Sequence, residues 1–396
     1  MGVEGGFLAV LKSGAAFALS KVAPFLFASL VIRVSDAGVY GLLAGGIALL
    51  AFGAQITGLG MQTYLPHLVA RHGYVNTKSL LAANAHIAVG IGALSFIFGT
   101  SISALRLTDL PFDSNLAVGL FALCMFLYTC FQIVSSTFIG LGLAWLSQIL
   151  SGLIFFLALG LVVLAAWVMG FELYSYTLEV LFLATSISAI ASVLCFYLVR
   201  SGHVVGLSCT AFADLWPFYG NQIFAVGGGV LFLFIAASLL DPNEFAMVQL
   251  HLMLAGISGL MAQVLNPVVS PYRSRLSLSG DWQAVRRLGR LTMASCFMWY
   301  LLIAIVLVQF YVPIMNLWAG GAVDHRPSLL FVFLLAFGVR SAAGGLGAHL
   351  LMTGFGKHLI PYQFGATSIM LTVIACSSLV GAEPISSLLW GFCCFF

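Results

Sequence analysis

The sequence predicts an all-α, polytopic membrane protein with about 12 transmembrane helices in two six-helix lobes. Three observations support this fold class. The composition is 62% hydrophobic and only 7% charged, and the mean hydropathy is +1.11. Twelve long apolar stretches follow one another along the chain. The charges in the segments between these stretches alternate in sign.

The composition indicates that lipid is the solvent for most of the chain. An ordinary soluble domain carries about 25% charged residues, whereas this chain of 396 residues carries 7%. The net charge of +3 is spread over the connecting segments and indicates no nucleic-acid partner. The first apolar stretch is long, follows Lys12 and lacks a small-x-small cleavage site, so it predicts a membrane helix rather than a cleavable signal.

The lengths of the apolar stretches match membrane helices. A helix needs about 20 apolar residues to cross a hydrocarbon core about 30 Å thick, and continuous apolar runs favour helices over β-strands. The predicted spans are 12–34, 39–65, 79–101, 115–139, 144–169, 176–199, 213–239, 244–269, 286–311, 327–352, 359–381 and 385–396. The last span is short, because its residues make only about 18 Å of helix. Either this helix begins earlier or the chain stops before the helix is complete.

The basic residues predict how the chain is inserted. If the N-terminus is inside, ten basic residues of the connecting segments face the cytoplasm: Lys12, Arg71, Lys78, Arg200, Arg273, Arg275, Arg286, Arg287, Arg290 and Lys357. Only Arg33, Arg106 and Arg326 face outside, together with most of the acidic residues. Basic residues are retained on the cytoplasmic side. We therefore expect a multi-pass protein of the bacterial inner membrane with both termini in the cytoplasm.

An internal repeat divides the chain into two lobes. Asp36 aligns with Asp241 (241 − 36 = 205), and Pro66 aligns with Pro271 at the same offset without a gap. Both copies consist of a helix, a short acidic turn, a second helix and a basic loop. Six spans per half is an even number, so both halves enter from the same side. Such a parallel repeat suits alternating access between two lobes. The predicted lobes are 1–205 and 206–396.

Two cations lie well inside predicted spans, Lys21 in the first and Arg340 in the tenth. A charge at mid-bilayer costs about 2.5–3.5 kcal/mol on insertion scales, so each should face protein or water. Lys21 could instead snorkel to the headgroups, and Arg340 could be a buried partner of a carbonyl or an acid. No acid lies in mid-span to neutralise them, which favours a cationic lining for an anionic substrate. Arg33, at the outer end of the first span, is either a local ion-pair partner or a further ligand.

Polar residues also gather on two helix faces. In the seventh span Asn221 shares a face with Ala225 and Gly228, and Gln222 adjoins it. In the eighth span His251 begins a stripe of small and polar residues. Tight helix packing through small residues is one explanation of both patterns. The other is the wall of a water-filled cavity, in which His251 could also titrate and couple to protons.

The sequence contains no motif that predicts an enzyme. It has no exposed Ser/His/Asp set, no phosphate-binding P-loop and no soluble nucleotide-binding domain. We therefore expect no cofactor, and any energy for transport should come from a gradient. The eight cysteines lie mostly inside apolar spans without metal-ligand spacing, so we expect buried small side chains and no metal site.

Several turns resemble those of a known family. The segment 33–41, with its arginine, acidic turn and aromatic-glycine pair, looks like the corresponding turn of polysaccharide flippases. These are the O-antigen translocases of the multidrug/oligosaccharidyl-lipid/polysaccharide exporter superfamily. Segment 240–246 is similar to the same turn in the second half, and 354–357 resembles the glycine-lysine turn after the tenth helix. Ser35 departs from the usual glycine-containing turn, and the twelfth span is shorter than expected.

The resemblance implies two helical bundles around a cationic cavity. The implied substrate is an oligosaccharide on undecaprenyl diphosphate, moved from the cytoplasmic to the periplasmic leaflet. Lys21 and Arg340 would then hold the diphosphate, with Arg33 near the outer exit, and polar groups would line a hydrated path for the sugar. The polar groups in question are Asn221, Gln222, His251 and Gln263. The implied partners are this lipid-linked substrate, membrane lipid, and polymerase and chain-length proteins of the same pathway.

Three other functions stay open on the sequence. A cation-coupled drug or metabolite antiporter of the same superfamily would be expected to hold a membrane carboxylate, and none lies in mid-span. A facilitator-superfamily transporter would show a glycine- and arginine-rich loop after the second span, where this chain has residues 71–78. A membrane-bound glycosyltransferase or polymerase would show a large outer loop.

Overall fold

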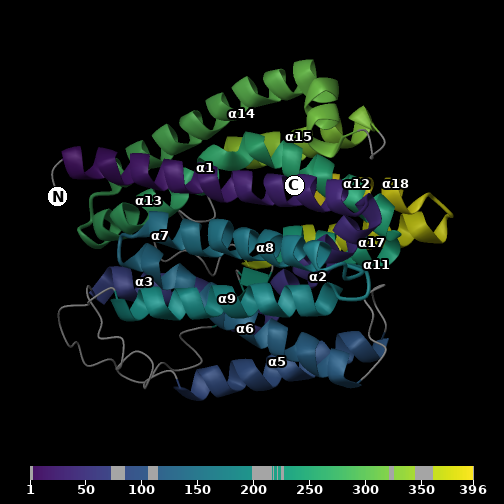
Figure 1. Ribbon diagram of the computed structural model, residues 1–396. Helices are drawn as coiled ribbons and strands as arrows, with labels where there is room; N and C mark the ends of the chain where they lie inside the picture. The colour runs from purple at the N-terminus through teal and green to yellow at the C-terminus, as the bar shows by residue number, and fades with distance from the viewer. Residues whose placement is uncertain are drawn as a thin grey trace. The chain divides into compact units, whose positions relative to one another are not determined.

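The computed structural model describes residues 3–72, 85–105, 115–198, 216, 218–220, 222–223, 227–320, 325–343 and 360–395. Within these ranges the chain forms helices and turns and contains no strand (Figure 1). The predicted all-α fold class is therefore confirmed. The helices of each bundle run side by side with roughly parallel axes, as expected for segments that cross one lipid layer.

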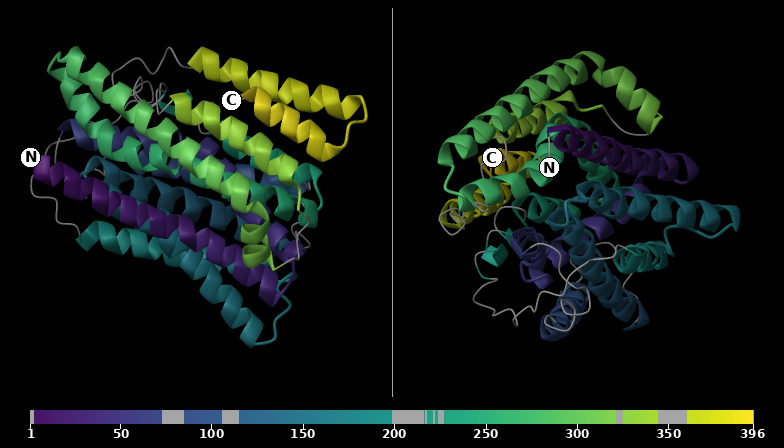
Figure 2. Two further views of the ribbon diagram at one scale, coloured as in Figure 1. Left: turned by 90° about the horizontal axis from the view of Figure 1, so that it is seen from above. Right: turned by 90° about the vertical axis from the view of Figure 1, so that its left-hand side faces the viewer.

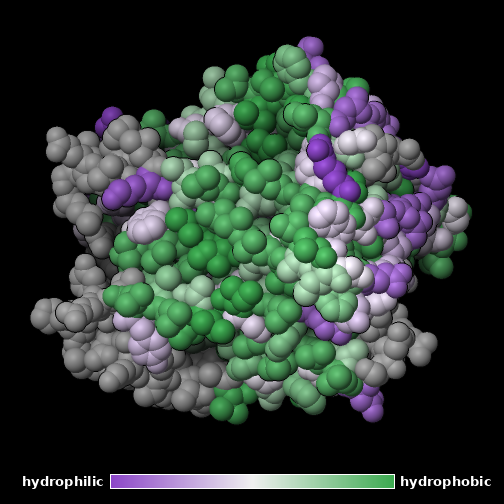
Figure 3. All heavy atoms as spheres, in the orientation of Figure 1, coloured by the Kyte–Doolittle hydropathy of each residue, from purple (hydrophilic) through white to green (hydrophobic). Residues whose placement is uncertain are grey.

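In the described part of the chain, apolar helices coincide with all the predicted spans. Eight are long and apolar enough to cross a membrane: Gly14–Val34, Ala37–Thr57, Asn115–Gly140, Ala144–Val168, Thr177–Leu198, Pro242–Asn266, Trp282–Ala319 and Ile360–Leu379. Four shorter apolar helices fill the other positions: Val89–Ile102, Gly229–Leu239, Pro327–Ala343 and Pro384–Cys393. The chain is a multi-pass membrane protein. Apolar side chains make up much of the visible surface of the described residues, as expected for helices that face lipid (Figure 3).

Contacts between Cα atoms group the chain into two compact units. The first contains Met1–Phe27 and Gly45–Ile223, and the second contains Ala28–Ala44 and Phe224–Phe396. The turn between the first two helices therefore belongs to the second unit. The lobe boundary predicted at 205/206 falls in the segment 199–215, which lies outside the described residues. The division into 1–205 and 206–396 stays a prediction.

The first unit is built around one central helix. Its elements are the parts of α1 (Val3–Val34) and α2 (Ala37–Thr57) given above, α3 (Met61–His72), α5 (Ala85–Leu105), α6 (Asn115–Gly140), α7 (Ala144–Gln148), η1 (Ile149–Ile154), α8 (Phe155–Val168) and α9 (Thr177–Leu198). Helix α6 packs against α3, α5 and α9. Phe121, Phe131 and Phe138 of α6 are at most 1% exposed, so this helix supplies much of the core.

The second unit has its core where α12, α14 and α15 meet. Its elements are α11 (Gly227–Leu239), α12 (Pro242–Gly256), η3 (Ile257–Gly259), α13 (Leu260–Leu278), α14 (Trp282–Ala319), α15 (Pro327–Ala343), α17 (Ile360–Leu379) and α18 (Pro384–Phe395). The rings of Phe232, Phe333 and Phe392 form a cluster with centroids 4.5 to 6.2 Å apart. This cluster anchors the short helix α18, which lies beside α17 at the yellow end of the chain (Figure 2, left).

The internal repeat is visible in the element boundaries. Helix α1 ends at Val34 and α11 ends at Leu239, while α2 begins at Ala37 and α12 begins at Pro242. Both pairs of positions are 205 residues apart (239 − 34 = 242 − 37 = 205). The second helix of each half therefore starts at the equivalent residue, and the repeat that the sequence predicts at this turn is confirmed.

Both copies of this turn are capped in the same way. The Oδ1 atom of Asp36 accepts a hydrogen bond from the amide of Val39 at 2.8 Å. The Oδ1 atom of Asp241 accepts one from the amide of Glu244 at 2.9 Å. An aspartate at this position satisfies an amide that has no partner within the helix. The acidic turn that the two halves share in sequence is thus a pair of equivalent helix caps.

The two copies of the turn pack against each other inside the second unit. A Cβ atom on Gly38 would lie 3.3 Å from the side chain of Asn243, its equivalent in the repeat. A Cβ atom on Gly41 would lie 1.8 Å from the carbonyl oxygen of Pro242. Only glycine allows the backbone of α2 to approach α12 so closely. This contact explains why residues 28–44 group with the second unit.

The predicted second span, 39–65, is two helices rather than one. Helix α2 ends at Thr57 and α3 begins at Met61. Between them Leu59 has a φ of 49° and Gly60 a φ of 78°, both in the left-handed region. In the second half the corresponding span keeps its direction but tightens to the short 3-10 segment η3 between α12 and α13. The second helix is therefore interrupted in the first half, whereas in the second half it continues as one 25-residue helix, Pro242–Asn266.

Helix α14 extends beyond the predicted span 286–311 at both ends. It has 38 residues, or about 57 Å of helix, and begins at the N-cap Asp281, whose side chain accepts from the amide of Ala284 at 3.0 Å. Its backbone leaves helical geometry at Phe310, three residues before Pro313. A proline inside a helix removes one hydrogen bond and kinks the helix. The last turns after Phe310 thus take a separate direction.

Candidate functional site

Lys21 lies in α1, within the first unit. Its side chain is half-buried, and the Nζ atom lies 5.3 Å from the centre of the Phe17 ring. A cation above an aromatic face is stabilised electrostatically. The preceding residue, Ser20, packs closely on Gly152. A Cβ atom added to Gly152 would lie 2.4 Å from the Cβ atom of Ser20. Lys21 is therefore positioned beside the π-helical turn η1.

The interruption between α2 and α3 carries a cluster of uncharged polar side chains. Gln222 is 2% exposed and accepts a hydrogen bond from the Thr63 hydroxyl at 3.1 Å. Its Nε2 atom donates to the carbonyl of Gln55 at 3.4 Å. The broken helix exposes main-chain groups that a continuous helix would pair internally. Gln222 thus binds to the end of α2 and to the first turn of α3.

Further amides complete this cluster in the first unit. Gln55 donates to the Oε1 atom of Gln62 at 3.5 Å, while Gln62 donates to the carbonyl of Ala54 at 3.3 Å. The hydroxyls of Thr57 and Thr129 lie 3.1 Å apart. The Oε1 atom of Gln55 is buried and has no hydrogen-bond partner among the described residues. A donor such as a hydroxyl group or water would satisfy it.

The predicted site residue Asn221 lies outside the described residues. Of the polar pair predicted on the seventh span, only Gln222 can therefore be placed. The sequence suggested packing or a cavity wall for this pair. The structure gives Gln222 a specific set of partners at a helix break, which no helical periodicity could indicate because Thr63 is 159 residues away.

Arg33 caps the end of another helix. Its Nη2 atom donates to the carbonyl oxygen of Leu317 at 2.8 Å. Leu317 lies in the last turn of α14, where carbonyl groups have no partner within the helix and a positive charge is favourable. Asp36, the acid three residues away, accepts from Val39 instead. Arg33 therefore binds the C-terminus of α14 rather than its acidic neighbour.

His251 is fully buried in the second unit, with both ring nitrogens hydrogen-bonded. Its Nδ1 atom lies 2.7 Å from the carbonyl oxygen of Met247, and its Nε2 atom lies 2.6 Å from the hydroxyl of Tyr311. A carbonyl oxygen only accepts, so Nδ1 carries the proton. Complete burial disfavours a charged imidazole, so the ring is neutral and its Nε2 atom accepts from the Tyr311 hydroxyl.

Arg340 lies in the last turn of α15 and is exposed in the second unit. Two residues earlier, Gly338 meets Tyr300 of α14, since an added Cβ atom would lie 2.7 Å from the phenol oxygen. Arg340 is 13 residues beyond Pro327, the first residue of α15, which is about 20 Å along the helix. The short connection before Pro327 contains His325, whose ring packs on that of Tyr311.

The predicted site residues thus form three separate groups. Arg33 and His251 both contact the C-terminal part of α14, at Leu317 and Tyr311, which are about 9 Å apart along a helix. Arg340 lies at the opposite end of α15 from these contacts. Lys21 and Gln222 belong to the first unit. Within each unit, therefore, the structure does not bring the cations together into one cluster.

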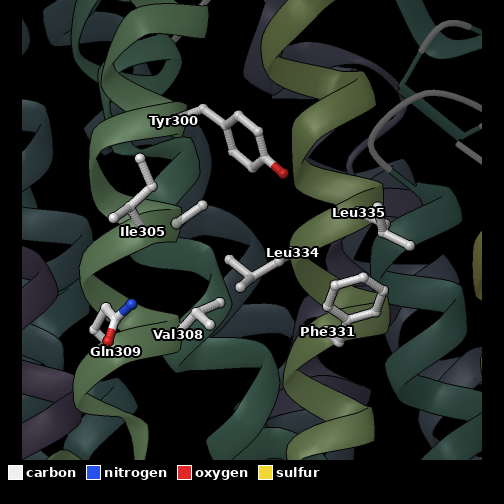
Figure 4. A pocket seen from close by; sticks show the side chains of 8 residues that line it. Tyr300, Ile305, Val308, Gln309, Phe331, Leu334 and Leu335 are labelled. Carbon is white, nitrogen blue, oxygen red and sulfur yellow. The ribbon is translucent and has the colours of Figure 1, made fainter.

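A groove between α14 and α15 was not indicated by the sequence. It has a volume of about 260 Å³ and is lined by Tyr300, Ala304, Ile305, Val308, Gln309, Phe331, Leu334 and Leu335. Tyr300 points from α14 toward α15, and Leu334 points back toward α14 (Figure 4). None of its lining side chains is charged. The groove suits an apolar chain rather than an anion.

The described acidic residues all lie near helix ends or in turns. They are Glu4, Asp36, Glu172, Glu179, Asp241, Glu244, Asp281 and Glu383. Asp36, Asp241 and Asp281 each accept a hydrogen bond from a main-chain amide at the start of a helix. In the described spans no carboxylate therefore lies near the middle of the membrane, where Lys21 and Arg340 were predicted.

No protein-family model and no curated protein sequence matches this chain. Solved structures do match its fold. A multidrug resistance MATE family transporter of the MOP superfamily, in an outward-facing conformation, has a TM-score of 0.62 and 12% identity, over 98% of this chain and 92% of that one. A MATE transporter in complex with MaL6 has a TM-score of 0.63 and 12% identity over the same shares.

A MOP superfamily transporter from Pyrococcus furiosus also matches, with a TM-score of 0.63 and 12% identity over 98% of this chain and 92% of that one. That structure is described by the reversed polarity of its binding pocket, which suggests a different function for it. These matches span nearly the whole of both chains. The chain therefore has the fold of the MATE-type transporters of the MOP superfamily.

Proposed function

We propose that this protein is a membrane transporter that works by alternating access. The observation that carries the proposal is the match to transporter structures over 98% of the chain. The interrupted second helix of the first half adds support, because broken helices provide main-chain groups for substrates in many transporters. Most basic residues lie in one set of connecting segments and most acidic residues in the other. Because basic segments stay in the cytoplasm, this distribution supports insertion in the bacterial inner membrane with both termini in the cytoplasm.

The proposed substrate is an oligosaccharide on undecaprenyl diphosphate, carried from the cytoplasmic to the periplasmic leaflet. Its diphosphate needs cations to offset the loss of hydration. Lys21 lies inside the membrane helix α1, and Arg340 belongs to the predicted tenth span although it lies in the last described turn of α15. Every described acid lies near a helix end or in a turn. This imbalance favours an anionic rather than a cationic substrate. The lipid tail can remain in the bilayer during transfer.

The polar cluster at the α2–α3 interruption suits the sugar. Gln222, Gln55 and Gln62 offer amide groups near a helix break, and the Oε1 atom of Gln55 has no partner among the described residues. Sugar hydroxyls can donate to such an acceptor. We also assign Arg33 and His251 to the proposed substrate site. In the structure Arg33 is hydrogen-bonded to Leu317 and His251 to Tyr311, both in helix α14. Polymerase and chain-length proteins of the same pathway are the proposed partners.

A second candidate is a cation-coupled antiporter for drugs or metabolites. The observation that favours it is that two of the matching structures are described as multidrug or ligand-bound MATE transporters. His251, buried and bonded to Tyr311, is the titratable group that would take part in coupling to protons. The scarcity of mid-membrane carboxylates among the described residues weighs against this candidate.

Translocation in liposomes separates the two candidates. The purified protein is reconstituted with diphosphate-linked oligosaccharide, and the exposure of the sugar to an impermeant modifying reagent is followed over time. We expect protein-dependent transfer that the Lys21→Ala/Arg340→Ala variant loses by at least tenfold. The charge-preserving variant Lys21→Arg/Arg340→Lys should retain part of the rate. The same liposomes are tested for proton- or sodium-driven uptake of a cationic dye.

The matched control is Lys12→Ala/Arg287→Ala, which removes two cations that are exposed. It should transfer the lipid at the wild-type rate, and the unfolding temperature of every variant is measured beside the rate. Unchanged transfer in the Lys21→Ala/Arg340→Ala variant would remove these residues from the site. Gradient-driven dye transport without lipid transfer would rule out the flippase function and support the antiporter function.

A further inference from the structure

Arg273 is a buried cation that the proposed transport site does not use. It lies in α13 and is 1% exposed, although the sequence placed it in a cytoplasmic loop. Helix α13 continues to Leu278 and so carries this side chain against α14, beside Cys296. Burial lowers the pKa of the guanidinium from its ordinary value. Arginine nevertheless stays charged in proteins, so a full positive charge is enclosed here.

Among the described residues, no acidic side chain forms an ion pair with this charge. The Nε and Nη1 atoms of Arg273 are buried and have no hydrogen-bond partner among the described residues. The nearest acid along the chain is Asp281, and its Oδ1 atom accepts from the amide of Ala284. An unpaired buried charge is strongly unfavourable unless a counter-ion binds it. The guanidinium of Arg273 is therefore buried without an ion-pair partner among the described residues.

A second polar group on the same helix face is also unsatisfied. The Oδ1 atom of Asn266 is buried and has no hydrogen-bond partner among the described residues. Asn266 precedes Arg273 by seven residues, or two turns, so both side chains leave α13 on the same side. Asn266 and the neighbouring Gln263 are only half-buried. Together these groups form a polar face along which a ligand can approach Arg273.

The helix that packs against α13 is basic at its start. Arg286, Arg287 and Arg290 follow in the first turns of α14 and are exposed. The Cys296 thiol beside Arg273 is a weak donor and acceptor and provides no compensating charge. The chemistry of the site thus selects an anion with several acceptor oxygens.

We propose that Arg273, with Asn266 on the same face of α13, binds a phosphate group. Guanidinium groups and phosphate form strong charge-assisted hydrogen bonds. The phosphate can belong to a lipid headgroup or be a free phosphate ion, and the two share the same chemistry. The amide of Asn266 accepts from a hydroxyl group next to that phosphate. The site lies in the second unit and does not depend on the substrate proposed above.

Binding is measured on the full-length protein in an uncharged detergent at constant ionic strength. Three probes are titrated: inorganic phosphate, phosphatidylglycerol, and diacylglycerol as the matched lipid without phosphate. The readouts are the unfolding temperature and the lipids retained in native mass spectrometry. We expect phosphatidylglycerol to raise the unfolding temperature and diacylglycerol not to do so. A rise with inorganic phosphate as well assigns a free-anion site, and its absence assigns a headgroup site.

The variants decide whether Arg273 is responsible. Arg273→Met should weaken phosphate binding about 10- to 100-fold, the size expected for losing a hydrogen bond to a charged group. Arg273→Lys keeps the positive charge but loses the planar guanidinium group, so its affinity for phosphate should lie between those of the wild type and Arg273→Met. Lys12→Met, which removes an exposed cation of the first unit, is the control and should bind like the wild type. Without ligand, Arg273→Met should unfold at the same temperature as the wild type or higher.

Two results would overturn the proposal. One is equal binding of the phosphate-bearing probes to the wild type and Arg273→Met. The other is an equal response of the wild type to phosphatidylglycerol and diacylglycerol. If Arg273→Met does not fold, Arg273→Lys still decides the question, because wild-type affinity in that variant together with reduced stability indicates a structural arginine.

Discussion

The hydroxyl of Tyr311 lies 2.6 Å from the Nε2 atom of His251, and this bond joins α12 to the kinked end of α14. His251 uses its other nitrogen on the carbonyl of Met247, one turn earlier in its own helix. The imidazole is therefore held as a single neutral tautomer. Because His251 is fully buried, water cannot replace a hydrogen-bond partner that a substitution removes.

Removing the Tyr311 hydroxyl should destabilise the protein. In Tyr311→Phe the Nε2 atom of His251 stays buried without a donor, which costs about 1–3 kcal/mol. His251→Phe should cost a similar amount, since it leaves the Tyr311 hydroxyl without this partner. The double variant should be more stable than the sum of the single effects predicts, by roughly 1 kcal/mol or more. The measurement is a double-mutant cycle of unfolding free energies in detergent, and strictly additive effects would show that the two groups act independently.

The equivalent caps at Asp36 and Asp241 lead to a second prediction. Replacing either aspartate by alanine removes the acceptor for one main-chain amide and should cost about 1 kcal/mol. Asparagine keeps an oxygen at the same position, so Asp36→Asn and Asp241→Asn should stay close to the wild type. Unfolding temperatures of the four variants test this. Equal losses for the alanine and asparagine variants would mean that the negative charge, rather than the cap, matters.

These caps show what the sequence can predict. The offset of 205 between Asp36 and Asp241 is visible in the chain, and the helix boundaries repeat at that offset. Apolar length predicts the spans because the membrane sets a minimum length for each helix. The interruption at Leu59 and Gly60 was not predicted from the apolar pattern. Glycines such as Gly58 and Gly60 also occur inside continuous membrane helices, so they do not by themselves indicate a break.

The candidate site was less predictable than the fold. Lys21, Gln222, His251 and Arg340 could be chosen because polar groups are expensive in a membrane. Their partners could not be predicted, because they come from distant parts of the chain: Thr63 for Gln222 and Tyr311 for His251. Arg273 was assigned to a cytoplasmic loop because it follows the end of the predicted span 244–269. Only the length of α13 reveals that this arginine is enclosed.

The close approach of α2 and α12 depends on Gly41. An added Cβ atom would lie 1.8 Å from the carbonyl oxygen of Pro242, so Gly41→Ala must push the two backbones apart. Overpacking of this kind typically costs about 1–3 kcal/mol. Gly90→Ala is the matched control, because no atom lies within 4 Å of the position that its Cβ would occupy. That variant should be neutral or slightly stabilising, as alanine is the better helix former.

Unfolding temperatures of the two glycine variants, measured side by side, give the test. A loss for Gly41→Ala together with no loss for Gly90→Ala supports the contact between the two repeat turns. Equal behaviour of both variants would mean that the backbones of α2 and α12 do not meet at this point. The comparison is sensitive because both glycines lie in apolar helices and both changes add a single methyl group.

The proposed orientation makes a prediction for two exposed serines. Ser175 lies in the turn before α9, and Ser279 lies in the turn before α14. If basic connections face the cytoplasm, a cysteine at Ser175 faces the periplasm and one at Ser279 faces the cytoplasm. In a background with the exposed Cys376 and Cys393 replaced by serine, an impermeant maleimide should label Ser175→Cys once the outer membrane is opened. Ser279→Cys should be labelled only after the inner membrane is disrupted, and the reverse pattern would invert the orientation and the proposed direction of transport.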